Sequence, residues 1–200
     1  IIAFFLGSSI LYANFLLLRI ISDFFSQITA GNALKANLLP KFTKLYQKNK
    51  ELSLSNLFYF SEKISIYLFV ITQIIQTSVI FYLNLHTDVL FFVISIILSL
   101  SISCNFISFL FLTVFQARGQ FSKFSWASIF NSSVFTALAF PLISFFSVLG
   151  LALSRLFGVL VIIWKFIFPI RKEVYGEKLT INISDFNFPT LILGNFANIV

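Results

Sequence analysis

The sequence predicts an all-α, polytopic transmembrane helix bundle, and three observations indicate this class. Hydrophobic residues make up 58% of the 200 positions and charged residues only 10%, whereas a soluble domain carries about 25% charged residues. The mean hydropathy is +0.97. Several apolar stretches also reach the roughly 20 residues that a helix needs to cross a bilayer. A chain of this composition cannot cover a globule with a hydrated surface, so a soluble enzyme, a disordered tail and a secreted disulfide scaffold are excluded.

Four stretches have the length and composition of membrane spans. They cover residues 64–85, 89–115, 124–146 and 148–168. A fifth span is expected over residues 10–30, after a turn at residues 7–9, and it contains Arg19 and Asp23. The apolar run at residues 189–200 predicts the start of a further span, so the whole chain is expected to form one transmembrane domain. Because the sequence contains no Met, we expect it to be an internal fragment.

The charges of the connections predict how the chain is oriented. Lys and Arg residues gather in the connections at residues 41–63, 118–123 and 171–178, and they are absent from the connections at 84–88 and 141–147. This alternation is the one that the positive-inside rule describes, so the three basic connections are expected to face the cytoplasm.

Residues 35–50 have a pattern of their own. Apolar residues recur there at helical spacing with lysines mostly on the other side. The pattern predicts an amphipathic helix at the membrane interface, kinked at Pro40. Lysines that reach out to lipid phosphates from the end of a helix would explain the pattern equally well.

Three ionisable residues fall inside predicted spans, where a charge is costly unless it is paired or faces water. Arg19 and Asp23 are four residues apart on one helix face and can pair. They are expected either to line a cavity for an anionic headgroup or to form a neutralised pair needed only for folding. Arg155 has no carboxylate within a turn of its own helix, so it is expected to reach outward to the interface or to face a hydrated cavity, where its planar guanidinium suits a phosphate.

The remaining polar residues of the spans are mostly small. Serines cluster with Asn105 between residues 95 and 108, and Asn131 precedes two serines in the next span. Such residues allow helices to approach closely and form hydrogen bonds between them, so packing is the preferred interpretation over substrate contact.

The sequence shows no catalytic constellation, neither a Walker loop nor a nucleophile elbow, so a transporter is expected rather than an enzyme. One Cys and one His are too few for a zinc site, and no cofactor or metal is expected. The basic residues are not interleaved with exposed aromatics, so nucleic acid is not an expected partner.

Several stretches occur in an order that is typical of one family. Gly-Ser-Ser at residues 7–9, Ala-Gly-Asn-Ala at 30–33 and Leu-Pro-Lys-Phe at 39–42 follow the order of motifs around the second span of that family. Residues 114–131 and 149–158 are similar to two of its later segments. In these stretches, which lie between residues 7 and 158, the sequence resembles the MurJ/MviN family of lipid II flippases within the multidrug/oligosaccharidyl-lipid/polysaccharide exporter superfamily.

The resemblance implies a fold, an activity and a set of site residues. The fold would be one lobe of a fourteen-helix bundle in a bacterial inner membrane. The activity would be translocation of a lipid-linked glycan precursor of the undecaprenyl-pyrophosphate type for peptidoglycan synthesis, by alternating access and without ATP. The candidate cavity residues are Arg19, Asp23 and Arg155, together with Ser26 and Gln27, which the resemblance places there.

The sequence also departs from the family pattern. Ser26 and Gln27 stand where the family has a pair of arginines, and Gly31 stands where it has a glutamate. These departures leave open an exporter of another lipid-linked polysaccharide unit, of the O-antigen type, or a multidrug extruder of the same superfamily.

Overall fold

The regular structure of the protein is helical wherever the chain is described. The computed structural model describes residues 9–30, 35–36, 38–40, 42–44, 54–86 and 88–169. Its helices are α2 (Ser9–Ala30), α4 (Leu54–Tyr82), α5 (Val89–Ala117) and α6 (Phe121–Ile162), and α6 continues into the π-helical turn η1 (Ile163–Ile167). Helices suit a bilayer because backbone polar groups in hydrocarbon need partners within the protein, and a helix supplies them within its own segment. The predicted all-α class is confirmed for the described residues.

Three helices in this part of the chain are long and apolar enough to cross a membrane. They are Ser61–Tyr82, Val89–Ala117 and Phe121–Ile167, and they indicate a membrane protein. α2 is not among them, although the sequence predicts a span over residues 10–30. Arg19 and Asp23 lower the mean hydropathy of α2. The face of α2 that carries Ser22 and Ser26 is directed toward the other helices. The predicted span start at 189–200 and the basic connection at 171–178 lie outside the described residues.

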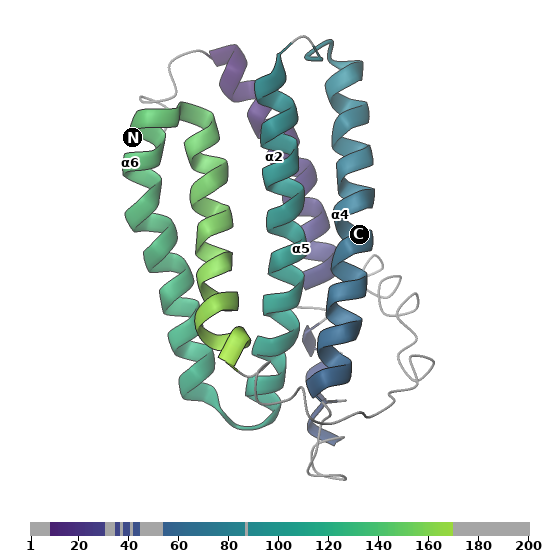
Figure 1. Ribbon diagram of the computed structural model, residues 1–200, viewed down its shortest axis with the longest axis vertical. Helices are drawn as coiled ribbons and strands as arrows, with labels where there is room; N and C mark the ends of the chain where they lie inside the picture. The colour runs from purple at the N-terminus through teal and green to yellow at the C-terminus, as the bar shows by residue number, and fades with distance from the viewer. Residues whose placement is uncertain are drawn as a thin grey trace.

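α5 occupies the centre of the bundle. α4 packs along one side of α5 and α6 along the other, while α2 crosses behind them and packs mainly on α5 (Figure 1). α5 is accordingly the most buried helix, with small polar residues such as Ser95 and Ser99 among its buried positions. Small residues let neighbouring helices approach closely, so the serines that the sequence analysis assigned to packing do lie between helices here.

α6 folds back on itself at Ser147. This residue has φ 53° and ψ −125°, a non-helical conformation inside an otherwise helical segment. The two arms of α6 run antiparallel, as Figure 1 shows in green and yellow-green. The break coincides with the boundary that the sequence predicts between residues 146 and 148. The second arm therefore returns along the first and carries Arg155 back into the bundle.

The short helical pieces between residues 35 and 44 lie against the bundle. Leu38 and Phe42 are each 1% exposed and join a core cluster with Phe106 and Phe111 of α5. The amphipathic pattern predicted there is present, since Lys44 is exposed. The apolar side of these pieces packs against α5, and their location at the membrane interface stays a prediction.

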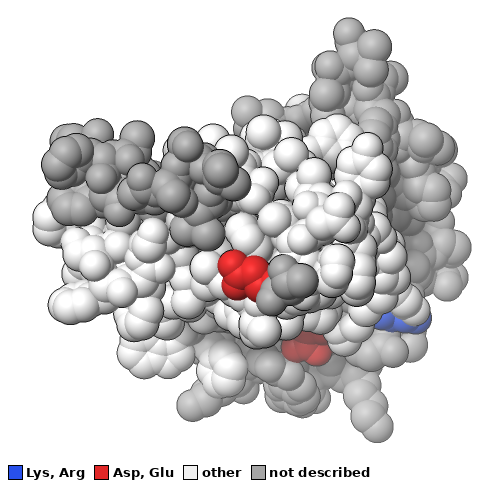
Figure 2. All heavy atoms as spheres, turned by 90° about the horizontal axis from the view of Figure 1, so that it is seen from above, with Lys and Arg blue, Asp and Glu red and all other residues white. Residues whose placement is uncertain are grey.

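The two ends of the bundle differ in charge. Figure 2 looks onto the end where α4 connects to α5, and its coloured atoms are mostly white, with one red side chain in front, a second red one deeper in the view and blue only at one edge. Asp88 lies at this end, where its side chain caps α5 by accepting a hydrogen bond from the Leu90 amide at 2.9 Å. Lys63, Arg118, Lys123 and Lys165 lie toward the opposite end, near the start of α4, the α5–α6 turn and η1.

The backbone at Ser147 generates a first prediction. A positive φ strains any residue with a Cβ by about 1–3 kcal/mol, so Ser147→Gly is expected to raise the free energy of unfolding by about 1 kcal/mol after the entropic cost of glycine. The measurement is thermal unfolding in detergent. Ser144→Gly, at an exposed helical position three residues earlier, is the control and is expected to destabilise by about 0.5–1 kcal/mol. Destabilisation by both changes would contradict the strain at Ser147.

Two glycines of the second α6 arm generate another prediction. A Cβ on Gly150 would lie 2.0 Å from the Leu142 carbonyl oxygen, and one on Gly158 would lie 2.7 Å from Oδ1 of Asn131. Overpacking usually costs about 1–3 kcal/mol, and a backbone carbonyl can yield less than a side-chain amide. Gly150→Ala is therefore expected to lower the unfolding temperature more than Gly158→Ala. The reverse order would contradict the close approach of Gly150 to the Leu142 carbonyl oxygen at the α6 bend.

Candidate functional site

A polar cavity lies between α2, α5 and the two arms of α6. Its volume is about 340 Å³, within the lower part of the range of about 300–1,000 Å³ that ligand pockets span. Its apolar wall includes Phe15, Leu98, Phe135 and Leu151. The polar lining residues are Arg19, Ser22, Ser26, Ser101, Asn105, Asn131, Ser132 and Arg155. Amide, hydroxyl and guanidinium donors thus converge on one space inside a bundle of apolar helices.

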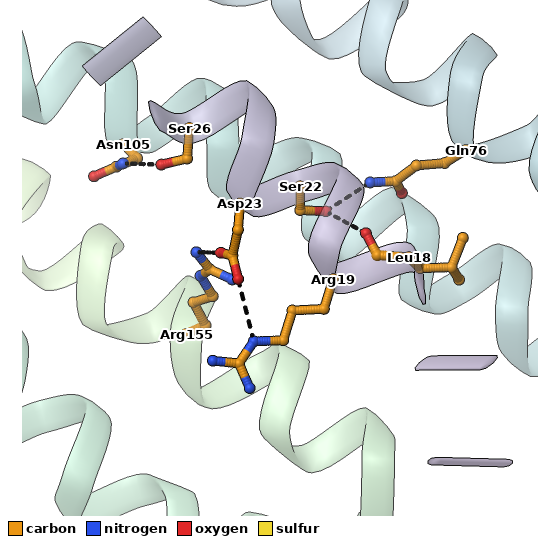
Figure 3. Close-up of polar contacts among 8 residues, drawn as sticks. All are labelled: Leu18, Arg19, Ser22, Asp23, Ser26, Gln76, Asn105 and Arg155. Carbon is orange, nitrogen blue, oxygen red and sulfur yellow. Dashed lines mark hydrogen bonds and ion pairs between the residues drawn. The ribbon is translucent and has the colours of Figure 1, made fainter. Parts of the chain in front are cut away.

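An ion triad crosses the edge of this cavity. Arg155 Nη2 donates a hydrogen bond to Oδ1 of Asp23, and this contact ties the second arm of α6 to α2. Arg19 Nε lies 3.4 Å from Oδ2 of the same carboxylate. Figure 3 shows the two arginines reaching Asp23 from different sides. Two guanidinium groups share one carboxylate, so the triad has a formal charge of +1.

Arg155 retains an unused donor. Its Nη1 is buried and has no hydrogen-bond partner in the described part of the chain. A buried donor without an acceptor costs about 1–3 kcal/mol, and more on a charged group. An anion in the cavity would balance the excess charge of the triad.

Hydrogen bonds between side chains hold α2 against its neighbours. Asn105 Nδ2 on α5 donates to Ser26 Oγ at 2.9 Å, and Gln76 Nε2 on α4 donates to Ser22 Oγ at 2.7 Å. Ser22 Oγ in turn donates to the Leu18 carbonyl at 3.0 Å (Figure 3). The face of α2 that carries Arg19, Ser22 and Ser26 is therefore fixed toward the cavity by both neighbouring helices.

The structure brings together most of the site residues predicted from the sequence. Arg19, Ser26 and Arg155 line the cavity, and Asp23 bridges the two arginines. The predicted Arg19–Asp23 pair is confirmed. Arg155 faces the cavity rather than the interface. The carboxylate that pairs with Arg155 is on α2, so the sequence of the helix that carries Arg155 does not contain this partner. Gln27 is exposed and is not among the lining residues.

Four of the lining residues are ones for which the sequence favours helix packing. Ser101 and Asn105 come from α5, and Asn131 and Ser132 from the first arm of α6. A signal was present in the spacing, because Ser101 and Asn105 are four apart, as are Ser22 and Ser26 on α2, so each pair shares one helix face. The sequence alone does not tell which polar face meets another, because that depends on how the helices are rotated in the bundle.

The fold and the site together define a class, a membrane-embedded helix bundle with a cationic polar cavity. Comparisons with protein-family models, with curated proteins and with solved structures find no match. The function is therefore argued from the residues of the cavity and from the resemblance of the motifs.

The ion triad generates a prediction about stability. In a double-mutant cycle, Asp23→Asn and Arg155→Gln are expected to couple by about 1–3 kcal/mol, because Asp23→Asn takes from Arg155 the carboxylate that it meets between two helices. Asp23→Asn and Arg19→Gln are the matched cycle and should couple by only about 0.3–0.5 kcal/mol, as exposed pairs within one helix do. Both are measured as free energies of unfolding in detergent. Equal coupling in the two cycles would argue against Arg155 as the principal partner.

Proposed function

We propose that this protein is a membrane flippase that translocates a lipid-linked glycan precursor, of the type handled by the MurJ/MviN family, across a bacterial inner membrane. The observation that carries the proposal is the shared carboxylate of Asp23, which leaves two arginines with excess positive charge beside a polar cavity. The membrane class of the chain, with three helices long and apolar enough to span, is the setting that such an activity requires.

The chemistry of the cavity suits a phosphate-bearing headgroup. Guanidinium groups form paired hydrogen bonds with phosphate oxygens, and both Arg19 and Arg155 line the cavity. The hydroxyl and amide groups of Ser26, Asn105 and Asn131 would then meet the sugar hydroxyls. In this proposal the substrate anion displaces Asp23 from one or both arginines, so the carboxylate occupies the site when no headgroup is bound.

Transport requires that the cavity open to each side of the membrane in turn. The resemblance supplies the proposed mechanism, in which one lobe of a fourteen-helix bundle rocks against the other while the lipid tail stays in the bilayer. The helices described here would belong to the first lobe. The basic end of the bundle, with Lys63, Lys123 and Lys165, would face the cytoplasm by the positive-inside rule.

A second candidate is an exporter of another lipid-linked polysaccharide unit, of the O-antigen type. It is favoured by Ser26, which lines the cavity where the family has an arginine, so the headgroup contacts differ from those expected for lipid II. A multidrug extruder of the same superfamily is less well supported. It would need a carboxylate available to a cation, and both oxygens of Asp23 are engaged by arginines.

The proposal predicts that Arg155→Ala strongly slows headgroup translocation while membrane insertion stays intact. The assay follows a fluorescent undecaprenyl-pyrophosphate disaccharide in vesicles containing the full chain, with a membrane-impermeant quencher reporting each leaflet. Loss of a charge-assisted phosphate contact of about 1.5–3 kcal/mol predicts flipping slower by about tenfold or more. Arg155→Lys, which keeps the charge but loses the planar fork, is expected to flip at an intermediate rate.

Lys63→Ala removes an exposed cation outside the cavity and is the matched control, with an expected rate equal to that of the unchanged protein. Flipping of an O-antigen-type substrate but not of the peptidoglycan-type one would favour the second candidate. Unchanged flipping in Arg155→Ala would remove this residue from the site, and the absence of flipping with both substrates would overturn the proposal.

A further inference from the structure

A group of aromatic rings and lysines lies at the basic end of α6, away from the cavity. The Nζ atom of Lys165 lies 3.6 Å from the centroid of the Phe130 ring, which also contacts the Trp126 and Phe166 rings at centroid distances of 6.1 and 6.0 Å. Lys123 is on the same face of α6 as Phe130, seven residues or about 10 Å earlier along the helix. We call these five residues the lysine–aromatic patch.

Both lysines of the patch are seated against rings. Besides the contact between Lys165 and Phe130, the Nζ atom of Lys123 lies 5.7 Å from the centroid of the Phe115 ring on α5. A ring face attracts an ammonium group through its quadrupole and orients it. The ammonium has three donors, so those directed away from the ring remain able to meet an acceptor. Both lysines are exposed.

None of the described carboxylates lies at the patch. Asp23 is bound to the arginines of the cavity, and Asp88 caps α5 at the opposite end of the bundle. Glu62 is on α4, which lies on the other side of α5 from α6 (Figure 1). Within the described residues, the charge of the patch is therefore positive and is not balanced by an acidic side chain beside it.

The surroundings of the patch are those of a membrane surface. Trp126 is 55% exposed, and Phe121 and Ile129 of the same arm are exposed as well. Tryptophan is enriched at the depth of the lipid headgroups, where its ring meets apolar chains and its N–H meets polar groups. A ligand of this surface must therefore combine an anionic group for the lysines with an apolar part for the rings.

We propose that the lysine–aromatic patch binds an anionic phospholipid of the adjacent leaflet. The phosphate lies between the ammonium groups of Lys123 and Lys165, and the Trp126 indole lies against the glycerol region. Basic residues next to a membrane span attract anionic lipids through the surface charge of the leaflet, and two lysines held by rings give that attraction a defined position. This site is separate from the cavity and does not depend on the proposed transport activity.

The chain offers a direct spectroscopic test, because Trp126 and Trp164 are its only tryptophans. The full chain carrying Trp164→Phe has Trp126 as its sole tryptophan and is reconstituted in phosphatidylcholine vesicles with a minor fraction of phosphatidylglycerol. In one set of vesicles the phosphatidylglycerol is brominated near the headgroup, and in the other an equal fraction of the phosphatidylcholine is brominated. We expect brominated phosphatidylglycerol to quench Trp126 fluorescence more strongly, and we expect added salt to reduce the difference.

The variants identify the residues responsible. At about 1 kcal/mol per lysine, Lys123→Gln with Lys165→Gln is expected to weaken the preference for phosphatidylglycerol roughly thirtyfold. Lys123→Arg with Lys165→Arg keeps both charges and should retain the preference. Lys63→Gln, an exposed lysine of α4, should leave it unchanged.

Three results of the quenching assay would overturn the proposal. They are equal quenching by the two brominated lipids, a preference that survives the double glutamine change, and a preference lost in the double arginine change. Soluble glycerol phosphate is added as a competitor. If it displaces the lipid at comparable concentration, the patch is a site for free phosphate and the assignment to a membrane lipid is wrong. Each of these readings stands whether or not the protein flips a glycan lipid.

Discussion

The ion pair between Asp23 and Arg155 is the interaction on which the site depends. Hydrocarbon cannot solvate a lone charge, so an arginine inside a membrane bundle must find a counter-ion or water. α2 packs mainly on α5 and meets α6 only lightly, so this pair is the principal described link between α2 and the returning arm of α6. The cavity lies beside that link and next to a core cluster to which α2 contributes Phe15 and Leu18 and the returning arm contributes Leu151.

The bend at Ser147 makes this pair available. It reverses α6, and Gly150 and Gly158 permit the close approaches that follow, to the Leu142 carbonyl and to Asn131. Without the reversal, Arg155 would lie far from α2. The strained backbone at Ser147 and the two glycines therefore position the Arg155 side chain and also allow the helices to pack closely.

The basic residues divide into two kinds with different chemistry. The cavity uses arginines, whose planar guanidinium groups can bind two acceptors at once and can share one carboxylate between them. The lysine–aromatic patch uses lysines, whose compact ammonium groups rest on ring faces while both side chains stay exposed. In the proposed functions, the arginines bind a headgroup that passes through the bundle, whereas the lysines bind a lipid that stays beside it.

The sequence by itself determined the membrane class, the helical fold, the break within residues 121–168 and the pairing of Arg19 with Asp23. Each of these follows from local hydropathy or from spacing along one helix. Only the tertiary structure decided that Arg155 pairs with Asp23, that Ser101, Asn105 and Asn131 line a cavity, that Gln27 does not, and that Leu38 and Phe42 pack against protein. These outcomes depend on how each helix is rotated toward its neighbours, and that rotation is set by contacts between distant segments, which the periodicity of a single helix does not encode.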